Sequence, residues 1–494
     1  MNKPSSDAPG LDWLEERVRH EIDLLRHNYH PWVPPAGDVD GRPVLDVVIV
    51  GGGLYGLGLA WGLMRAKVTN ILVLDQAPLG REGPWMTFAR MPTLRTAKQL
   101  TGIEFGIPSL SLRAYWEAKF GPTSWEALSL TPRLEWVAYL EWFRRILDIP
   151  VQNETEVLSI DGDSGLARIT VRRDGETSEL LARRVVLATG LLGSGGKHVP
   201  VGLTENLAAD CWAHAADNID FTKLAGRDVG VLGAGATAFD NAIVAAEQGA
   251  SRSALFCRRP ELPWLSAKKG LENAGFMRHF ADFPDLYRWR FVKGITETPI
   301  PPPRHSIERF MERDNTELCL GSPWYATRME GDKVVVTTPA GDERFDFVIF
   351  GTGFDMKIDR RPELAAIAPH ALRWRDRFTP PVGEENETLL AQPYLGPGGE
   401  FQEHTPGIYP ALSRICMLGA AASLSVGPLF GGLNGVKFVL ERSVDETCRA
   451  LIMETLGTFY DRFKKGLSAE NPPVRWVRRI DGVLSSPLID FASR

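Results

Sequence analysis

Three glycines early in the chain have the spacing of a dinucleotide-binding loop. Gly51, Gly53 and Gly56 follow the apolar run 44–50 and open a segment rich in Leu, Ala and Gly. The first glycine permits a tight turn, the second lets backbone approach a pyrophosphate, and the third lets the helix pack closely. Asp75 ends the next apolar run, and its carboxylate suits a ribose hydroxyl. The pattern predicts FAD or NAD rather than a nucleotide with a 2′-phosphate.

A second loop of the same kind lies later in the chain. It is formed by Gly233, Gly235 and Ala238 and begins 182 positions after the first loop. The apolar run that follows it leads into Arg258 and Arg259 instead of an acidic residue. Because a guanidinium offers a planar fork of donors that matches phosphate oxygens, the second loop predicts NADPH. The alternative is a basic pair that faces solvent.

Each loop lies between two predicted strands and opens a predicted helix. The first unit has strands at 44–50 and 70–75 around a helix at 54–66, and the second has strands at 228–232 and 253–257 around a helix that ends near residue 248. Strand, glycine turn, helix and strand in this order form a βαβ unit. The sequence therefore predicts an α/β protein with two Rossmann-type dinucleotide-binding domains. Two stretches, 188–190 and 351–353, also repeat each other as [AG]-T-G after four apolar residues.

These motifs together resemble those of the two-dinucleotide-binding flavoproteins, and within them the class B flavoprotein monooxygenases. That group includes the flavin-containing, Baeyer–Villiger and N-hydroxylating monooxygenases. The resemblance covers about residues 44–460 and rests also on Gly83-Pro84-Trp85. It implies that the first loop binds FAD, that Trp85 lies by the flavin, and that the two [AG]-T-G stretches are hinges to an inserted NADPH domain.

The resemblance also implies an activity. In such an enzyme NADPH passes a hydride to FAD, O2 adds to give a flavin C4a-(hydro)peroxide, and one oxygen atom enters a small organic substrate. The alternative is an NADPH-dependent flavin reductase or oxidase that inserts no oxygen. A third alternative is a binding protein that has kept the fold and lost the chemistry. The five cysteines, which lie at least 32 residues apart, include no redox pair, and the sequence shows no metal-ligand cluster.

One position departs from the family pattern. Arg95, ahead of Lys98, stands where the family has a flavin-side Asn. One interpretation is that Arg95 orients an anionic substrate beside the flavin, which makes it the candidate active-site residue. The other is that both cations pair with carboxylates or with the FAD pyrophosphate. The family also has a fingerprint before the second loop, and its histidine would be His214. Here that fingerprint is degenerate, because Ala208 replaces its aromatic residue and Asp210 replaces its glycine.

Composition limits the partners. The 494 residues are 24% charged and 44% hydrophobic, with a formal net charge of −6. This is typical of a soluble globular protein, and the lack of any Lys/Arg-rich run argues against nucleic acid or an anionic membrane as a partner. The N-terminal residues show no leader pattern, and no window has 18 uninterrupted apolar residues. We therefore expect a cytoplasmic protein.

We expect four parts along the chain. Residues 1–43 form an N-terminal arm whose amphipathic helix at 11–25 stands outside the first domain and either packs on its own subunit or clamps a partner in a homodimer. The FAD domain is discontinuous, at 44–205 and 346–494, and the NADPH domain at 206–345 is inserted into it. A helix begins after Thr131 as its N-cap. The resemblance implies that a glycine-rich stretch, 427–435, closes over the flavin.

Overall fold

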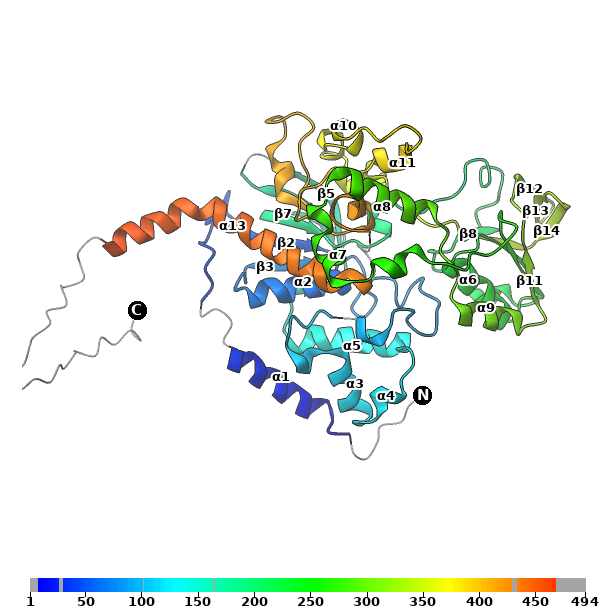
Figure 1. The fold of residues 1–494 in the computed structure, drawn as a ribbon, viewed down its shortest axis with the longest axis horizontal. Coiled ribbons are helices and arrows are strands. Elements are labelled where there is room, and N and C mark those ends of the chain that lie inside the picture. The colour runs from blue at the N-terminus through cyan, green and yellow to red at the C-terminus, as the bar shows by residue number, and fades with distance from the viewer. Residues whose placement is uncertain (1–7, 26–29, 101, 163–164, 429–432, 468–494) are drawn as a thin grey trace, which may run out of the picture.

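The computed structural model describes residues 8–25, 30–100, 102–162, 165–428 and 433–467. Two sheets lie side by side in the described chain (Figure 1). The first is mixed and the second is parallel, and a glycine loop follows an inner strand of each. The predicted α/β fold class is confirmed. Gly431 and Gly432 of the predicted glycine-rich stretch lie outside the described residues.

The first sheet has the strand order β4-β3-β2-β7-β6-β5, with β1 beside β2 and β16 beside β7. The pairs β2–β3, β3–β4, β2–β7 and β7–β16 are parallel, and the remaining pairs are antiparallel. Its strands are β1 (Asp38–Val39), β2 (Arg42–Val50), β3 (Ile71–Leu74), β4 (Val151–Gln152), β5 (Thr155–Gly162), β6 (Ala167–Arg173), β7 (Glu176–Leu187) and β16 (Ile415–Met417). The apolar end of β2 is buried on both faces, as its unbroken apolar run predicts.

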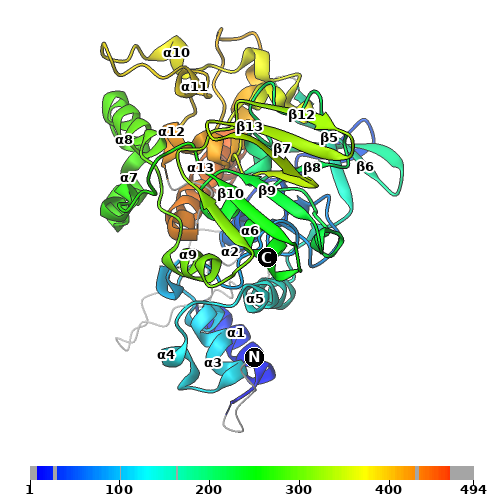
Figure 2. The same ribbon diagram turned by 90° about the vertical axis from the view of Figure 1, so that its right-hand side faces the viewer.

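The second sheet is parallel throughout, in the order β11-β10-β9-β15-β8. Its strands are β8 (Trp212–His214), β9 (Asp228–Leu232), β10 (Arg252–Phe256), β11 (Thr316–Cys319) and β15 (Phe347–Phe350). The antiparallel strands β12 (Ala326–Glu330), β13 (Lys333–Thr338) and β14 (Gly341–Phe345) form a third sheet. Figure 2 shows α6 and α9 on one face of the second sheet and this third sheet on the other.

The strand β15 corrects one boundary. It pairs with β9 and β8, so the chain leaves the second sheet only after Phe350, later than the predicted end of the inserted domain at residue 345. Its four apolar residues form an inner strand of that sheet, between β9 and β8, rather than the start of the returning FAD segment. The four-part division otherwise stays a prediction.

Helices cover both sheets. The longer ones are α1 (Leu11–Leu25), α2 (Leu54–Arg65), α3 (Leu112–Phe120), α5 (Arg133–Ile146), α6 (Ala236–Glu247), α8 (Asp285–Glu297), α9 (Arg304–Met311) and α13 (Val436–Leu467). The shorter ones are α4 (Ser124–Ala127), α7 (Ala274–His279), α10 (Trp374–Arg377), α11 (Glu387–Leu390) and α12 (Ser423–Val426). Among the described helices, none combines the length and the apolar character that crossing a membrane requires.

The helices α2 and α13 pack closely because α2 presents two glycines. A Cβ on Gly62 would lie 2.5 Å from the Val444 side chain, and one on Gly58 would overlap Leu440. Small residues at these positions let the backbone of α2 approach α13 closely. This contact holds the C-terminal helix on the helix that follows the first glycine loop.

The N-terminal arm packs on its own chain. Leu14 and Val18 of α1 are buried in the same core as the first sheet. The Glu21 carboxylate accepts hydrogen bonds from the backbone and hydroxyl of Ser109, and Glu15 pairs with Arg145 of α5. Of the two predicted alternatives the structure shows the packed arm, and the helix is part of the first core rather than outside it.

The helix α5 begins two residues after the predicted cap. Pro132 is the N-cap, with extended backbone angles (ψ 135°), and no side chain caps the helix. Thr131 is fully buried instead, and its carbonyl accepts the amide of Leu94. This tertiary pairing holds the backbone of Thr131 outside the helix, which the local sequence could not reveal.

Candidate functional site

The first loop joins β2 to α2, and its glycines are required by contact. Gly51 has φ +110°, and a Cβ there would lie 2.5 Å from the carbonyl oxygen of Ala188. A Cβ on Gly56 would overlap the carbonyl oxygen of Gly51. The third glycine thus lets α2 start directly on the turn, as the loop pattern predicts.

The carboxylate of Asp75 holds the backbone of this loop by hydrogen bonds. One carboxylate oxygen accepts the amide of Gly52 at 2.7 Å and the other accepts the amide of Ala77 at 2.8 Å. The side chain is nearly buried, and burial raises the pKa of its carboxyl. Each oxygen has a second lone pair. The same group can therefore hold the loop and accept a ribose hydroxyl.

The segment after β3 lies against the loop. A Cβ on Gly53 would be 3.8 Å from the Cα of Gly83, so two glycines face each other there without side chains. Trp85 is half-buried, and its ring meets Trp136 edge-to-face at 6.1 Å. The side chain of Arg133 donates to the carbonyl oxygen of Trp85. A rigid, side-chain-free face beside a helix N-terminus fits the pyrophosphate of FAD.

The second loop joins β9 to α6. Gly233 has φ +127°, and a Cβ there would overlap the carbonyl of Gly351. A Cβ on Gly235 would meet no heavy atom within 4 Å, so protein packing does not demand glycine at that position. The open backbone there has room for a ligand to approach closely. Ala238 is fully buried against Gly351.

Arg258 and Arg259 follow β10 at the same sheet edge as the second loop, since β9 and β10 are parallel neighbours. Arg258 is exposed and Arg259 is half-buried. Within the described residues, neither guanidinium has an ion pair or a side-chain hydrogen bond. Their charge is therefore available to a phosphate group at this edge.

Arg95 contacts the start of α6, the helix that follows the second dinucleotide loop. Its guanidinium pairs with Asp240 of α6 and approaches the carbonyl oxygen of Ala236 at 3.4 Å. Asp240 is buried, and burial raises the pKa of its carboxyl while Arg95 lowers it. Lys98 is also buried, and donates to the carbonyls of Trp125 and Leu128. The structure thus favours a carboxylate partner for Arg95.

Sequence reasoning missed Arg90. Its guanidinium donates to the carbonyl oxygens of Ala215 and Asp217, both at 2.7 Å, and lies 4.9 Å over the ring of Phe221. Burial lowers its pKa to about 10. Arg90 and Arg95 together attach the segment that follows Trp85 to the second sheet. No motif marks Arg90, because its partners are backbone carbonyls far away in sequence.

The chain that follows the first predicted hinge, at 197–198, lies beside the second predicted hinge. Lys197 and Phe354 form an antiparallel bridge, and the amide of His198 donates to the carbonyl oxygen of Gly353 at 3.1 Å. His214, at the end of the degenerate fingerprint, contacts the same carbonyl through Nε2 at 2.9 Å. Its Nδ1 accepts the amide of Ala216, and burial lowers the pKa of its ring. A neutral imidazole with Nε2 protonated satisfies both bonds.

Comparison with known proteins decides the family. A family model described as pyridine nucleotide-disulphide oxidoreductase matches residues 48–262. The FAD-dependent urate hydroxylase of Xanthomonas campestris pv. campestris is 41% identical over 434 residues, which cover 87% of this chain and 91% of that protein. This chain belongs to the FAD-dependent flavoprotein monooxygenases. It is an oxidoreductase, and the predicted class B resemblance is confirmed.

Solved structures show the same fold at lower identity. The ornithine hydroxylase from Pseudomonas aeruginosa aligns with a TM-score of 0.66 at 14% identity, over 83% of this chain and all of that one. The L-lysine 6-monooxygenase from Pseudomonas syringae aligns with a TM-score of 0.60 at 16% identity, over 82% and 99%. In the part of this chain that the structure describes, all five cysteines are free thiols without a disulfide partner.

Proposed function

We propose that this monooxygenase hydroxylates urate. The observation that carries the proposal is the 41% identity to a urate hydroxylase across 87% of the chain. The reaction balances as urate, O2, a reduced nicotinamide nucleotide and a proton giving hydroxylated urate, water and the oxidised nucleotide. Bound FAD supplies the capacity to accept a hydride and to activate O2.

The residues of the first loop hold FAD in this proposal. The amides at the start of α2 face the pyrophosphate, Asp75 accepts a ribose hydroxyl, and Gly53 and Gly83 leave room for the backbone to approach. Trp85 lies at the flavin side of this segment. Each contact binds or orients the cofactor, and none of these side chains transfers a proton.

The second loop holds NADPH. Gly233 and Gly235 offer backbone to the pyrophosphate, Ala238 packs the helix against the hinge, and Arg258 with Arg259 contacts the 2′-phosphate. The open space at Gly235 supports the pyrophosphate assignment, and the absence of ion pairs at both guanidiniums within the described residues supports the 2′-phosphate assignment.

Arg95 is a positioning residue in this proposal. Its ion pair with Asp240 fixes the first turns of α6, and therefore the second loop, against the segment that carries Trp85. Correct placement of NADPH against FAD depends on that alignment.

The test measures stoichiometry with the purified, FAD-loaded protein. Urate loss, NADPH oxidation and O2 consumption are followed together, with labelled O2 to trace the oxygen in the product. We expect equal amounts of all three and one labelled atom in hydroxylated urate. Ornithine and lysine serve as comparison substrates and should stimulate no NADPH oxidation. Full conversion of NADPH electrons to H2O2 without urate loss would overturn the proposal in favour of an oxidase.

A further inference from the structure

An exposed apolar stripe runs along the second half of α13. Met453, Leu456, Tyr460 and Phe463 are 52–60% exposed, although each is a large hydrophobic residue. Their spacing of three, four and three places them on one helix face. The rings of Tyr460 and Phe463 are 6.3 Å apart, which confirms the shared face. We call these four residues the α13 stripe.

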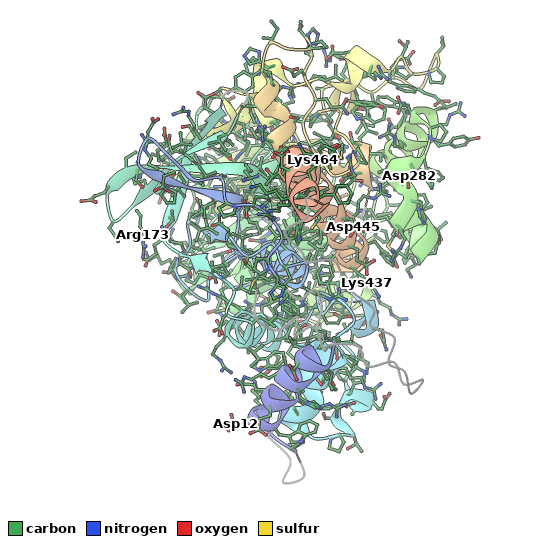
Figure 3. The ribbon with its side chains drawn as sticks, turned by 90° about the vertical axis from the view of Figure 1, so that its left-hand side faces the viewer. Asp12, Arg173, Asp282, Lys437, Asp445 and Lys464 are labelled. Carbon is green, nitrogen blue, oxygen red and sulfur yellow. The ribbon has the colours of Figure 1, made fainter. Side chains whose placement is uncertain are left out.

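The other face of this helix is already occupied. Leu451 and Thr455 are buried against the body of the protein, and Phe459 lies 6.4 Å from Trp32. Beyond Thr455 the described part of α13 has no buried residue, and the helix projects from the body in Figure 1. Figure 3 looks at the side toward which it projects, with Lys464 labelled near its end.

The stripe has the pattern of a two-helix seam. Apolar residues at alternating intervals of three and four are the a and d positions of a heptad repeat. The pattern is also self-complementary: a two-fold axis beside Thr458 places Met453 opposite Phe463 of a second copy, and Leu456 opposite Tyr460. A two-fold interface requires this property, since one surface must match itself.

Charge supports the antiparallel direction. The end of the described helix carries Arg462, Lys464 and Lys465 against one acid, Asp461, which pairs with Lys464. Antiparallel pairing carries this basic end toward a cavity of about 380 Å³ beside Met453, and the charged residues that line it are Glu400, Glu446, Glu454, Arg184 and Arg449. Among the described residues, no cation lies within ion-pair distance of the Glu400 carboxylate, which accepts the amide of Gly398. A parallel pair would instead bring two basic ends together.

We propose that the α13 stripe is the dimer interface of this protein and that its occupant is the same stripe of a second copy, paired antiparallel. The predicted dimer through α1 has a less continuous apolar surface. Leu14 and Val18 are buried in their own chain, and the exposed Trp13 lies about three helical turns from the exposed Leu24 and Leu25. Covering both stripes removes on the order of 1,000 Å² from water, since an aromatic side chain buries about 150–250 Å². That is near the lower limit for specific interfaces, so we expect a concentration-dependent dimer.

The test is sedimentation of the full chain over a range of concentrations. We expect the mass to rise from 54.7 kDa toward twice that value. Leu456→Asp and Tyr460→Asp should each weaken association at least ~10-fold. Met311→Asp, at an equally exposed apolar position on α9, is the matched control and should not change it. A full chain that stays monomeric at about 100 μM overturns the proposal, as does a monomer that binds anionic vesicles through the stripe.

Cross-linking tests the direction. A Met453→Cys chain mixed with a Phe463→Cys chain should form a disulfide-linked pair, whereas Met453→Cys alone should form none beyond the background of the unmodified chain. Cross-linking of Met453→Cys with itself would show a parallel pair and overturn the antiparallel arrangement. All these positions lie outside the dinucleotide loops, so FAD content reports that each variant is folded.

Discussion

Gly351 and Ala238 lie so close together that only one of them can carry a side chain. A Cβ on Gly351 would be 2.6 Å from the Cβ of Ala238. In the sequence of the first unit the residue types at the corresponding positions are exchanged: Gly56 lies on the helix and Ala188 at the strand end.

This relationship predicts a reciprocal effect. Gly351→Ala should destabilise the protein by roughly 1–3 kcal/mol, because overpacking forces the backbone apart, and should raise the KM for NADPH. Adding Ala238→Gly should recover part of both losses, since it removes the opposing methyl group. Thermal unfolding and steady-state kinetics check this. Equal losses in the single and the double variant would show that the two residues do not interact.

Asp75→Asn should release FAD. The substitution keeps the shape but replaces a charged acceptor of two backbone amides with a neutral group. A hydrogen bond to a charged group contributes about 1.5–3 kcal/mol, so the FAD dissociation constant should rise roughly 10–100-fold. Flavin fluorescence titration measures it. Asp174→Asn, at an exposed turn, is the control and should bind FAD as the unmodified chain does.

The basic pair should set nucleotide preference. Arg258→Ala and Arg259→Ala should each raise the KM for NADPH roughly 10–100-fold by removing charged hydrogen bonds to the 2′-phosphate. The KM for NADH should change little. Arg304→Ala, which removes an exposed arginine of α9, serves as the control. An equal loss with both nucleotides would point to a structural role.

The pair of Arg95 and Asp240 separates two roles. If Arg95 positions the second loop, Asp240→Asn should slow flavin reduction by NADPH and leave the KM for urate unchanged. If Arg95 instead binds an anionic substrate, Asp240→Asn releases the Arg95 guanidinium from its ion pair, and flavin reduction by NADPH should be unaffected. Arg95→Met alone leaves the buried Asp240 carboxylate unpaired, a change that costs about 3–5 kcal/mol of stability. The double variant with Arg95→Met and Asp240→Asn should therefore fold better and is the comparison to use. Stopped-flow reduction distinguishes these outcomes.

Asp46 gives a pH prediction. Burial raises the pKa of its carboxyl from about 3.9 to about 6, although Arg183 opposes the shift. The folded state therefore holds a proton that the unfolded state has lost, and stability falls as pH rises from about 4 to 6. The change approaches roughly 3 kcal/mol. Asp46→Asn should remove this part of the pH profile in chemical unfolding, whereas Asp174→Asn should leave it.

The sequence was sufficient for elements whose signal is local. The strands and helices around both glycine loops were predicted closely, because an apolar run that ends in glycines is typical of a buried strand followed by a tight turn. The partners of Arg95, Arg90 and Lys98 were not predictable, since each contacts residues far away in the chain. The same reason explains Thr131, whose carbonyl is held by Leu94 rather than by the helix.

The bridge between Lys197 and Phe354 has a mechanical consequence. The two chain segments that connect the nucleotide-binding halves are hydrogen-bonded to each other, so they move together. Arg90, which donates to the carbonyls of Ala215 and Asp217, adds a second attachment beside these segments, because the Asp217 carboxylate pairs with Lys197. Rotation of one nucleotide-binding half against the other would have to break the Arg90 contacts and the ion pair of Arg95 with Asp240.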